Sequence, residues 1–415
     1  MTQERQERYK NLEAQRDDVY EAYTARRYER QPQFYELFMK EEGIPIYGGL
    51  GVYDSRQLPM APWKRMGGKG TFIELDGQAG YFGMYAVEIP AGGVLNPERH
   101  IYEETIFVIE GRGSTEVWRE GSSKKQTFEW QTGSVFAPPL NVWHRLVNAT
   151  SSPALVVATT GAPNVMKLFP SRNFVFNNAT EFMERYDESE NYFKPSDEIE
   201  GSEKVMASLR TNLVPDVASC YIPRSNTRAP GQGQLSLKLS GNTFLTNGVF
   251  EYPSGRYSTG HCHAAGRVLI CLKGKGYSLN WDSKLGKRPW EAGKGHLVNR
   301  QDYIPGGFVT AAPGNGDWFH QHFSVAKESM RVIRLGSTNQ LDEGPGEEIE
   351  LPGGGIFLGP GRHIIFYPEE DPQILKDYKA ALAQEGVEFD MPESVYKKEA
   401  MPASTKDAYS AQEGV

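Results

Sequence analysis

The chain has 415 residues, with 45 Lys and Arg against 53 Asp and Glu, and a formal net charge of −8. This acidic balance argues against a nucleic-acid-binding protein, whose binding surface is basic. Hydrophobic residues make up 39% of the chain and aromatic residues 12%, which is enough for sizeable cores. No apolar run is long enough to span a membrane, so we expect no membrane partner.

Three cysteines are too few for a disulfide framework, and the first residues contain no apolar signal segment. We therefore expect a cytoplasmic protein. Residues 1–45 are rich in Glu, Arg and Gln, and Leu12, Val19 and Tyr23 give weak helical spacing. This segment is predicted to be a helical arm that packs on the body or on a second subunit. The alternative is a solvated helix with no further role.

Short apolar runs alternate with Gly and Pro over residues 46–170, and the same character returns over residues 236–345. This spacing is typical of the strands of a sandwich or barrel, so we predict two β domains. The polar residues 171–235 between them are predicted to be a connector with some helix. Residues 346–415 are predicted to be a C-terminal helix and a tail.

The clearest helix is predicted over residues 371–384. Asp371 can cap it, Pro372 takes the first helical position and Gly386 follows its end.

Six of the eight histidines fall in two clusters, one in each β domain. In a β-strand, residues i and i+2 point to the same face. His261 and His263 can therefore bind one ion, and so can Glu98 and His100. A further ligand then comes from another strand.

The first cluster resembles the motifs of the cupin superfamily. The first cupin motif, G(X)5HXH(X)3–4E(X)6G, matches at Gly92, His100, Glu104 and Gly111, with Glu98 where the first His is expected. The second motif, G(X)5PXG(X)2H(X)3N, matches at the positions that follow in the chain: Gly133, Pro139, His144 and Asn148, with Asn141 in place of Gly.

The second half matches the first motif more loosely. Gly255, His261, His263 and Gly274 keep the spacing, but Arg267 stands where the Glu is expected. The later ligand is His320 or His322, and we favour His320 because it follows a Pro/Gly turn at nearly the expected distance. The resemblance implies a bicupin: a mainly β chain with two cupin-type barrels of the double-stranded β-helix or jelly-roll kind.

The predicted C-terminal site offers three imidazoles, from His261, His263 and His320, and no carboxylate. Three protein ligands leave open positions, which is the pattern of a catalytic site. Imidazole suits iron, zinc, copper and nickel. The resemblance to non-haem iron dioxygenases of the cupin type, such as gentisate dioxygenase-like proteins, implies Fe(II) in this barrel.

Three further residues are candidates for contact with the substrate. If Arg267 points inward, it can bind a substrate carboxylate through both arms of its guanidinium and serve catalysis. The alternative is that it points outward or pairs with an acidic residue. Trp143 and Trp318, beside predicted ligands, are candidate pocket walls, although tryptophans in barrels more often belong to the core.

The predicted N-terminal site offers two carboxylates and two imidazoles, from Glu98, His100, Glu104 and His144. Such a set is harder and more anionic, which favours manganese, iron or zinc. Either this is a working metal site with a carboxylate in place of one histidine, or it has decayed and the barrel is structural.

The leading functional hypothesis is an oxidoreductase, a non-haem Fe(II) dioxygenase acting on a small aromatic or enolic carboxylate. The second is a hydrolase, lyase or isomerase that uses zinc or manganese, with Glu98 or Glu104 as general base if it is not a ligand. The third is a non-catalytic bicupin that binds a small ligand. Bicupins usually form dimers or larger assemblies, so we expect a homo-oligomer.

Overall fold

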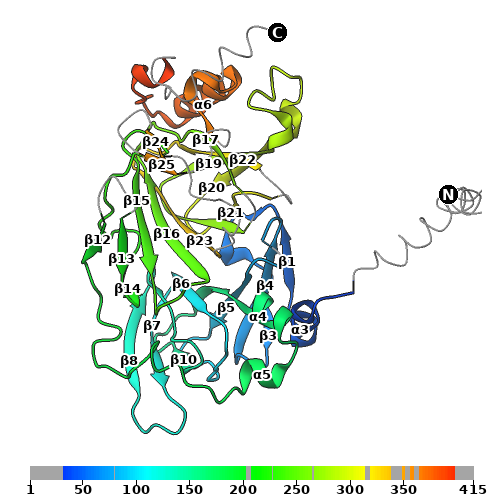
Figure 1. Cartoon of the computed structure of the whole chain (residues 1–415), viewed down its shortest axis with the longest axis vertical. Helices are drawn as coiled ribbons and strands as arrows, with labels where there is room; N and C mark the ends of the chain where they lie inside the picture. The colour runs from blue at the N-terminus through cyan, green and yellow to red at the C-terminus, as the bar shows by residue number, and fades with distance from the viewer. Residues whose placement is uncertain are drawn as a thin grey trace, which may run out of the picture.

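The computed structural model describes residues 31–397, with gaps at 79, 202–206, 227, 264–265, 314–317, 338–347, 351–355 and 359–363. The described chain is mainly β and consists of two halves stacked along the long axis of the molecule (Figure 1). Each half pairs a large sheet with a smaller one, as the sequence predicts for two cupin-type barrels. Most of the predicted N-terminal arm, and the tail after residue 397, lie outside the described residues.

The N-terminal half contains an eight-stranded sheet of order β1-β4-β5-β11-β6-β9-β14, with β3 paired to β4, and a three-stranded sheet of order β10-β7-β8. The strands of the large sheet are β1 (Ile46–Gly49), β3 (Ala61–Trp63), β4 (Gly68–Leu75), β5 (Gly83–Ile89), β6 (Glu104–Glu110), β9 (Val135–Phe136), β11 (Ala154–Thr160) and β14 (Leu213–Val214). Those of the small sheet are β7 (Arg112–Trp118), β8 (Gln126–Gln131) and β10 (Trp143–Val147).

The C-terminal half repeats this plan with sheets of order β12-β13-β15-β16-β23-β18-β21-β2 and β20-β19-β22-β17-β26. The first sheet consists of β2 (Gly51–Val52), β12 (Ile199–Glu200), β13 (Ser208–Arg210), β15 (Gly233–Lys238), β16 (Leu245–Tyr252), β18 (Arg267–Lys273), β21 (Phe308–Thr310) and β23 (Met330–Ser337). The second consists of β17 (Gly260–His263), β19 (Gly276–Asp282), β20 (Asn299–Tyr303), β22 (Trp318–Ser324) and β26 (Ile364–Ile365). A separate hairpin pairs β24 (Glu348–Glu350) with β25 (Ile356–Leu358).

The described residues form four α-helices and five short 3-10 helices. The α-helices are α3 (Phe34–Glu42), α4 (Ala162–Leu168), α5 (Arg172–Phe176) and α6 (Pro372–Glu385). The short 3-10 helices are η1 (Ser55–Gln57), η2 (Ser283–Leu285), η3 (Gly295–Leu297), η5 (Tyr367–Glu369) and η6 (Glu393–Tyr396). Figure 1 shows α3, α4 and α5 grouped at one side of the N-terminal half and α6 at the far end of the C-terminal half.

Helix α6 confirms the prediction for residues 371–384. The Asp371 carboxylate caps it by accepting from the backbone N–H of Gln373, and Gly386 ends it with a φ of 63°. Ile374, Tyr378 and Leu382 pack on the outer face of the second C-terminal sheet. None of the helices within the described residues has the length and the apolar character that crossing a bilayer requires.

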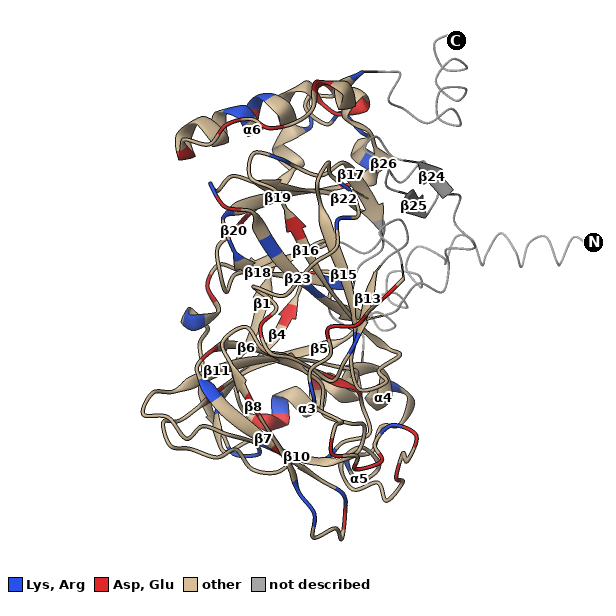
Figure 2. Cartoon of the chain, turned by 90° about the vertical axis from the view of Figure 1, so that its left-hand side faces the viewer, with Lys and Arg blue, Asp and Glu red and all other residues tan. Residues whose placement is uncertain are grey.

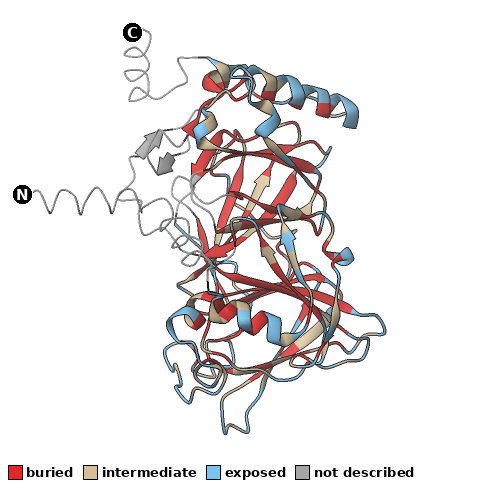
Figure 3. Cartoon of the chain, turned by 90° about the vertical axis from the view of Figure 1, so that its right-hand side faces the viewer, coloured by how far each residue is buried: buried red, intermediate tan, exposed pale blue. Residues whose placement is uncertain are grey.

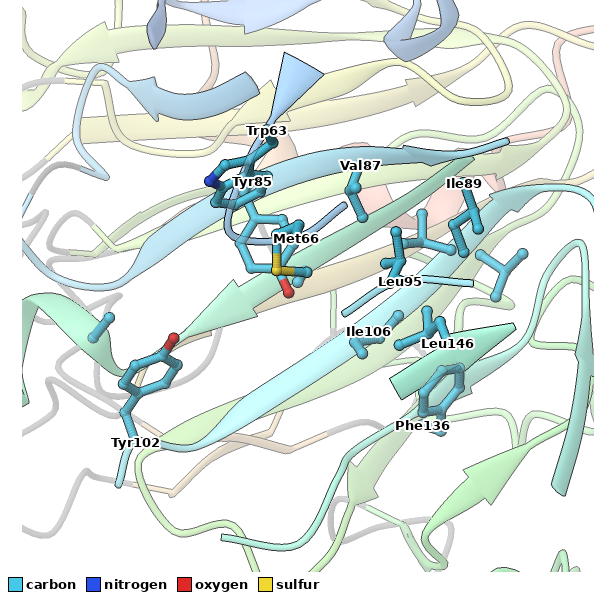
Figure 4. Close-up of a cluster of buried hydrophobic side chains, with 14 of the residues drawn as sticks. Trp63, Met66, Tyr85, Val87, Ile89, Leu95, Tyr102, Ile106, Phe136 and Leu146 are labelled. Atoms are coloured by element: carbon cyan, nitrogen blue, oxygen red, sulfur yellow. The ribbon is translucent and has the colours of Figure 1, made fainter. Parts of the chain in front are cut away.

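The large N-terminal sheet is buried on both faces, because apolar residues alternate between two cores. Along β5, Tyr85, Val87 and Ile89 point into the N-terminal barrel, where Figure 4 shows them in one apolar cluster. Met84 and Ala86 point the other way, into a second core that also contains residues of the C-terminal half. The two halves therefore stack back to back. Figure 3 shows the resulting burial of strands in both halves, with exposed residues mainly in loops and helices.

The glycines that close the first cupin motif in each half have the same structural role. Gly111 follows β6 with a φ of 104°, and Gly274 follows β18 with a φ of 76°. A Cβ on Gly111 would lie 2.5 Å from the Cβ of Ala154, and one on Gly274 would lie 2.8 Å from the Cα of Met330. Both positions combine a left-handed backbone with close contact to the next strand, so a side chain fits neither.

Candidate metal centre

Strand alternation places two of the four predicted N-terminal ligands inside the barrel. His144 lies on β10 on the same face as Leu146, whose side chain belongs to the N-terminal core. Glu104 begins β6 on the same face as Ile106 and Val108, which belong to that core as well. Because the two strands belong to facing sheets, both side chains point into the space between the sheets.

Backbone pairing places the other two predicted ligands, Glu98 and His100, next to the start of β10. Glu98 forms an isolated antiparallel bridge with His144. Its N–H donates to the His144 carbonyl at 2.9 Å, and the His144 N–H donates to the Glu98 carbonyl at 3.0 Å. The carbonyl of His100 accepts from the N–H of Asn141 at 3.1 Å. The segment that carries Glu98 and His100 is thus held against the start of β10.

The four side chains meet, and one donor atom of each lies within 4.8 Å of the others. Oε2 of Glu104 lies 3.4 Å from Nε2 of His100 and 3.3 Å from Nε2 of His144. Oε1 of Glu98 is farther out, at 3.8 Å from Nε2 of His144. Two donors bound at about 2.1 Å to one divalent ion are about 3 Å apart when they meet it at a right angle. The inner three residues therefore have the spacing of a common ion.

The two imidazoles are oriented by backbone carbonyls. Nδ1 of His100 donates to the Tyr102 carbonyl at 2.9 Å, and Nδ1 of His144 donates to the Val142 carbonyl at 3.1 Å. A carbonyl oxygen only accepts, so each Nδ1 holds a proton and each Nε2 faces Glu104. The ring of His100 also stacks on that of Tyr102, with centroids 3.7 Å apart.

Three of the facing atoms have no hydrogen-bond partner within the described residues. They are Nε2 of His100, Nε2 of His144 and Oε2 of Glu104, and all three are buried. Buried polar atoms are rarely left without a partner, because such a group costs free energy. A cation between them would satisfy all three, so the residues present fit a divalent metal.

The electrostatics of the cluster favour the ionised carboxylate that a metal requires. Burial alone would raise the pKa of Glu104, but His100 and His144 outweigh it and hold that pKa well below its ordinary value. Burial would lower the pKa of His144, but Glu104 outweighs it and raises that pKa. The Tyr85 hydroxyl adds a hydrogen bond to Oε1 of Glu104 at 2.7 Å.

Two residues at this site were missed in the sequence analysis. Tyr85 comes from β5, and Arg65, whose Nη1 donates to Oε2 of Glu98 at 2.6 Å, comes from the turn between β3 and β4. Figure 4 shows Tyr85 beside Trp63 and Met66 within the apolar cluster, with Tyr102 at its edge. The apolar period of β5 places Tyr85 on the inner face, but no motif marks Arg65, which lies far from the ligands in sequence.

In the C-terminal half, the structure brings His261 and His320 together. They are direct partners in the β17–β22 ladder, and their ring centroids are 4.0 Å apart. His322 is next on the same face, with its ring 5.4 Å from that of His320. Nδ1 of His322 lies 3.1 Å from the Tyr303 hydroxyl, and burial together with the charge of Arg228 lowers the pKa of His322 to about 3.

The backbone of His263 pairs with Trp318, but the His263 side chain lies outside the described residues. The set His261, His263 and His320 thus stays a prediction. Trp318 shares a face of β22 with His320. Arg267 shares the inward face of β18 with Leu269, and its Nη1 donates to the carbonyls of Gly266, at 3.0 Å, and Ser337. Its role in substrate binding also stays a prediction.

Trp143 does not line the N-terminal centre as expected. It precedes His144 on β10, so its side chain points to the opposite, outer face. There its Nε1 donates to Glu120 at 2.8 Å, and its ring packs beside that of Trp118 with centroids 6.3 Å apart. The guanidinium of Arg99 lies 5.0 Å from the same ring.

The family model described as a cupin domain matches residues 85–160, from β5 to the end of β11. This range contains all four residues of the centre. Residues 85–160 therefore form a cupin domain, and the second half of the chain repeats the sheet plan of the first. No curated protein matches the sequence.

Solved structures of similar fold include plant and bacterial proteins. A vicilin from Corylus avellana (hazelnut) has a TM-score of 0.41 at 10% identity and covers 70% of this chain and 86% of its own. A Bacillus subtilis oxalate decarboxylase with Mn(II) centres has a TM-score of 0.42 at 10% identity, over 69% of this chain and 76% of its own. A Lactobacillus farciminis oxalate decarboxylase in complex with formate has a TM-score of 0.41 at 10% identity, over 69% and 85%.

Proposed function

We propose that this chain is a metal-dependent enzyme, a non-haem Fe(II) dioxygenase, with its metal in the N-terminal barrel. His100, His144 and Glu104 would hold the ion, with Glu98 at its edge. The observation that supports this most is the set of three buried atoms that face one another without hydrogen-bond partners. Two imidazoles and one carboxylate with open positions are the ligand set typical of non-haem iron oxygenases.

Each part of the site has a task in this proposal. Bound iron would supply open positions where a small aromatic or enolic carboxylate and O2 are activated side by side. The carbonyls of Tyr102 and Val142 fix the orientation of the imidazoles. The Tyr85 hydroxyl holds Oε1 of Glu104, which leaves Oε2 for the ion. The apolar core around β5 and β6 limits access of water.

This proposal differs from the expectation of iron in the C-terminal barrel. Among the described residues, the side chains of Glu98, His100, Glu104 and His144 form a group whose donor atoms lie close enough together to hold one metal ion. An additional iron at His261, His263 and His320 stays a prediction for the second barrel. A homo-oligomer also stays a prediction, which light scattering in solution checks.

One observation favours a second candidate function. Glu98 lies farther from the imidazoles than Glu104 and is bound to Arg65. A carboxylate beside a metal but not bound to it is the arrangement of a general base. With zinc or manganese in place of iron, the same site would suit a hydrolase, lyase or isomerase.

The test is elemental analysis of protein purified without added metal, as wild type, His100→Ala and His261→Ala. We expect a single iron per chain that His100→Ala loses and His261→Ala retains. Oxygen uptake with aromatic and keto acids then tests the dioxygenase reaction. Zinc or manganese lost in His100→Ala would favour the second function. Metal lost only in His261→Ala would overturn the assignment to the N-terminal barrel, and no metal in any sample would overturn both functions.

A further inference from the structure

Arg65 is fixed in place at the edge of the candidate metal centre. It lies in the turn between β3 and β4, and its side chain is 23% exposed. The Asn96 amide donates to the carbonyls of Lys64 at 3.2 Å and Arg65 at 2.9 Å. The turn is thereby tied to the segment that leads to Glu98 two residues later.

One side of the Arg65 guanidinium is anchored by a carboxylate and by aromatic rings. Its Nε donates to Oε2 of Glu42 at 3.0 Å, and the same oxygen accepts from Nε1 of Trp63 at 2.6 Å. The guanidinium carbon lies 4.8 Å from the ring centre of Trp63, 5.7 Å from that of Phe38 and 5.6 Å from that of Phe176. Stacking on aromatic faces and one carboxylate hold the group even without a second acidic partner.

The other side of the guanidinium faces the centre. Nη1 donates to Oε2 of Glu98, while Oε1 of Glu98 lies 3.8 Å from Nε2 of His144. Nη2 makes no hydrogen bond within the described part of the chain. Glu98 thus lies between the Arg65 guanidinium and the His144 imidazole, and each of its two oxygens faces one of them.

We propose that Arg65 is the docking group for the carboxylate of the substrate, and that this carboxylate replaces Glu98 on the guanidinium. The inference rests on the proposed function, because it identifies the substrate-binding residue of the same site. Exchange of one carboxylate for another keeps the number of charge pairs unchanged, and Arg65 keeps Glu42 throughout. Nη1 and Nη2 together match the two oxygens of a carboxylate. The exchange releases Glu98, which can then bind the metal or accept a proton.

Calorimetric titration with benzoate tests the exchange, on the full-length protein as purified. Glu98→Gln should bind benzoate about tenfold more tightly than wild type, because the neutral amide competes less well for the guanidinium. Arg65→Gln should bind about tenfold more weakly or not at all. The matched control is Arg172→Gln. Arg172 also contacts Glu42, at 3.4 Å, but it does not contact Glu98, so this variant should bind as wild type does.

A Glu98→Gln variant that binds benzoate no more tightly than wild type, or does not bind it, overturns the inference. So does an Arg65→Gln variant with unchanged affinity and an unchanged melting temperature. The gain expected for Glu98→Gln cannot arise from misfolding, so the test does not depend on the stability of Arg65→Gln.

Metal content measured on the same samples separates this inference from the proposed function. If the wild type contains iron but Glu98→Gln and Arg65→Gln both bind benzoate with the wild-type affinity, the inference alone fails. If the purified protein contains no metal, but Glu98→Gln binds benzoate more tightly than wild type and Arg65→Gln more weakly, the proposed function alone fails.

Discussion

Tyr85 orients the central ligand of the candidate metal centre. Its hydroxyl donates to the Glu104 oxygen that does not face the imidazoles. Hydrogen-bond partners of metal ligands typically contribute about 10–100-fold to metal affinity. We therefore expect Tyr85→Phe to weaken metal binding by at least about tenfold. Competition with a chromophoric chelator measures this.

The control for Tyr85→Phe is Tyr367→Phe. Tyr367 is also buried, but its hydroxyl donates to the Tyr257 carbonyl in the C-terminal half. This variant should bind metal as wild type does. Equal affinity in both variants would mean that Glu104 needs no support from Tyr85.

Glu370 makes stability depend on pH. It is buried between the second C-terminal sheet and η5, and burial raises its pKa from 4.5 to about 8, although the Tyr257 hydroxyl and the Gln321 amide bind it. The fold therefore favours the protonated acid, so the contribution of Glu370 to stability is fully present below about pH 4.5 and is lost as pH rises through 8. We expect Glu370→Gln to melt higher than wild type at pH 9, with a much smaller difference at pH 5.

Thermal unfolding from pH 5 to pH 9 checks this expectation. Glu393→Gln is the matched control, because Glu393 is an exposed carboxylate in the same C-terminal segment. Its melting temperature should follow that of wild type throughout. Parallel curves for Glu370→Gln and wild type would contradict a raised pKa at Glu370.

At the scale of elements, motif spacing and strand periodicity explain why the four ligands of the site could be predicted from the sequence. The spacing of the cupin motifs identified Glu98, His100, Glu104 and His144, and apolar alternation along β6 and β10 turns the last two inward. The same alternation turns Trp143 outward, which its position beside His144 did not suggest. Arg65 could not be predicted, because its place depends on how the β3–β4 turn packs on a distant segment.

The segment between β5 and β6 also joins the two halves. Glu103, next to the ligand Glu104, accepts hydrogen bonds from the backbone N–H groups of Thr243, Phe244 and Leu245, each at 2.8 Å. Arg185 adds an ion pair at 3.2 Å. A single carboxylate of the first barrel thereby holds the loop that leads into β16 of the second.

Loss of this carboxylate should destabilise the whole chain. Glu103→Ala leaves the N–H groups of Thr243, Phe244 and the buried Leu245 without this acceptor, and we expect it to lower the free energy of unfolding by roughly 3 kcal/mol. Chemical denaturation followed by circular dichroism measures the change. Glu129→Ala, at an exposed position of β8, should change it little. A small effect of Glu103→Ala would mean that water replaces the carboxylate.

At the scale of the molecule, short strands exchanged between the halves escaped the sequence analysis. β2 lies between β1 and β3 of the first half in sequence but pairs with β21 of the second, and β14 comes from the predicted connector but pairs with β9 of the first. Each has two residues, which is too short for a periodic signal. Figure 2 shows most of the strand ribbon free of charged residues, although several strands carry some. Apolar patterning therefore predicted the long strands, but it did not predict which sheet the short strands join.

A shared core should make the two halves unfold together. Val157 and Phe107 of the first half and Leu335 and Ile270 of the second belong to one buried cluster. Leu335→Ala removes buried apolar volume and should cost about 2–5 kcal/mol. If the halves are coupled, the N-terminal barrel loses stability with the C-terminal one, and calorimetry gives a single transition at a lower temperature.

The control is Leu297→Ala, at a 48% exposed position, which should melt at nearly the wild-type temperature. Two separate transitions in Leu335→Ala, one at the wild-type temperature, would show instead that each barrel is stable on its own and that the interface contributes little cooperativity.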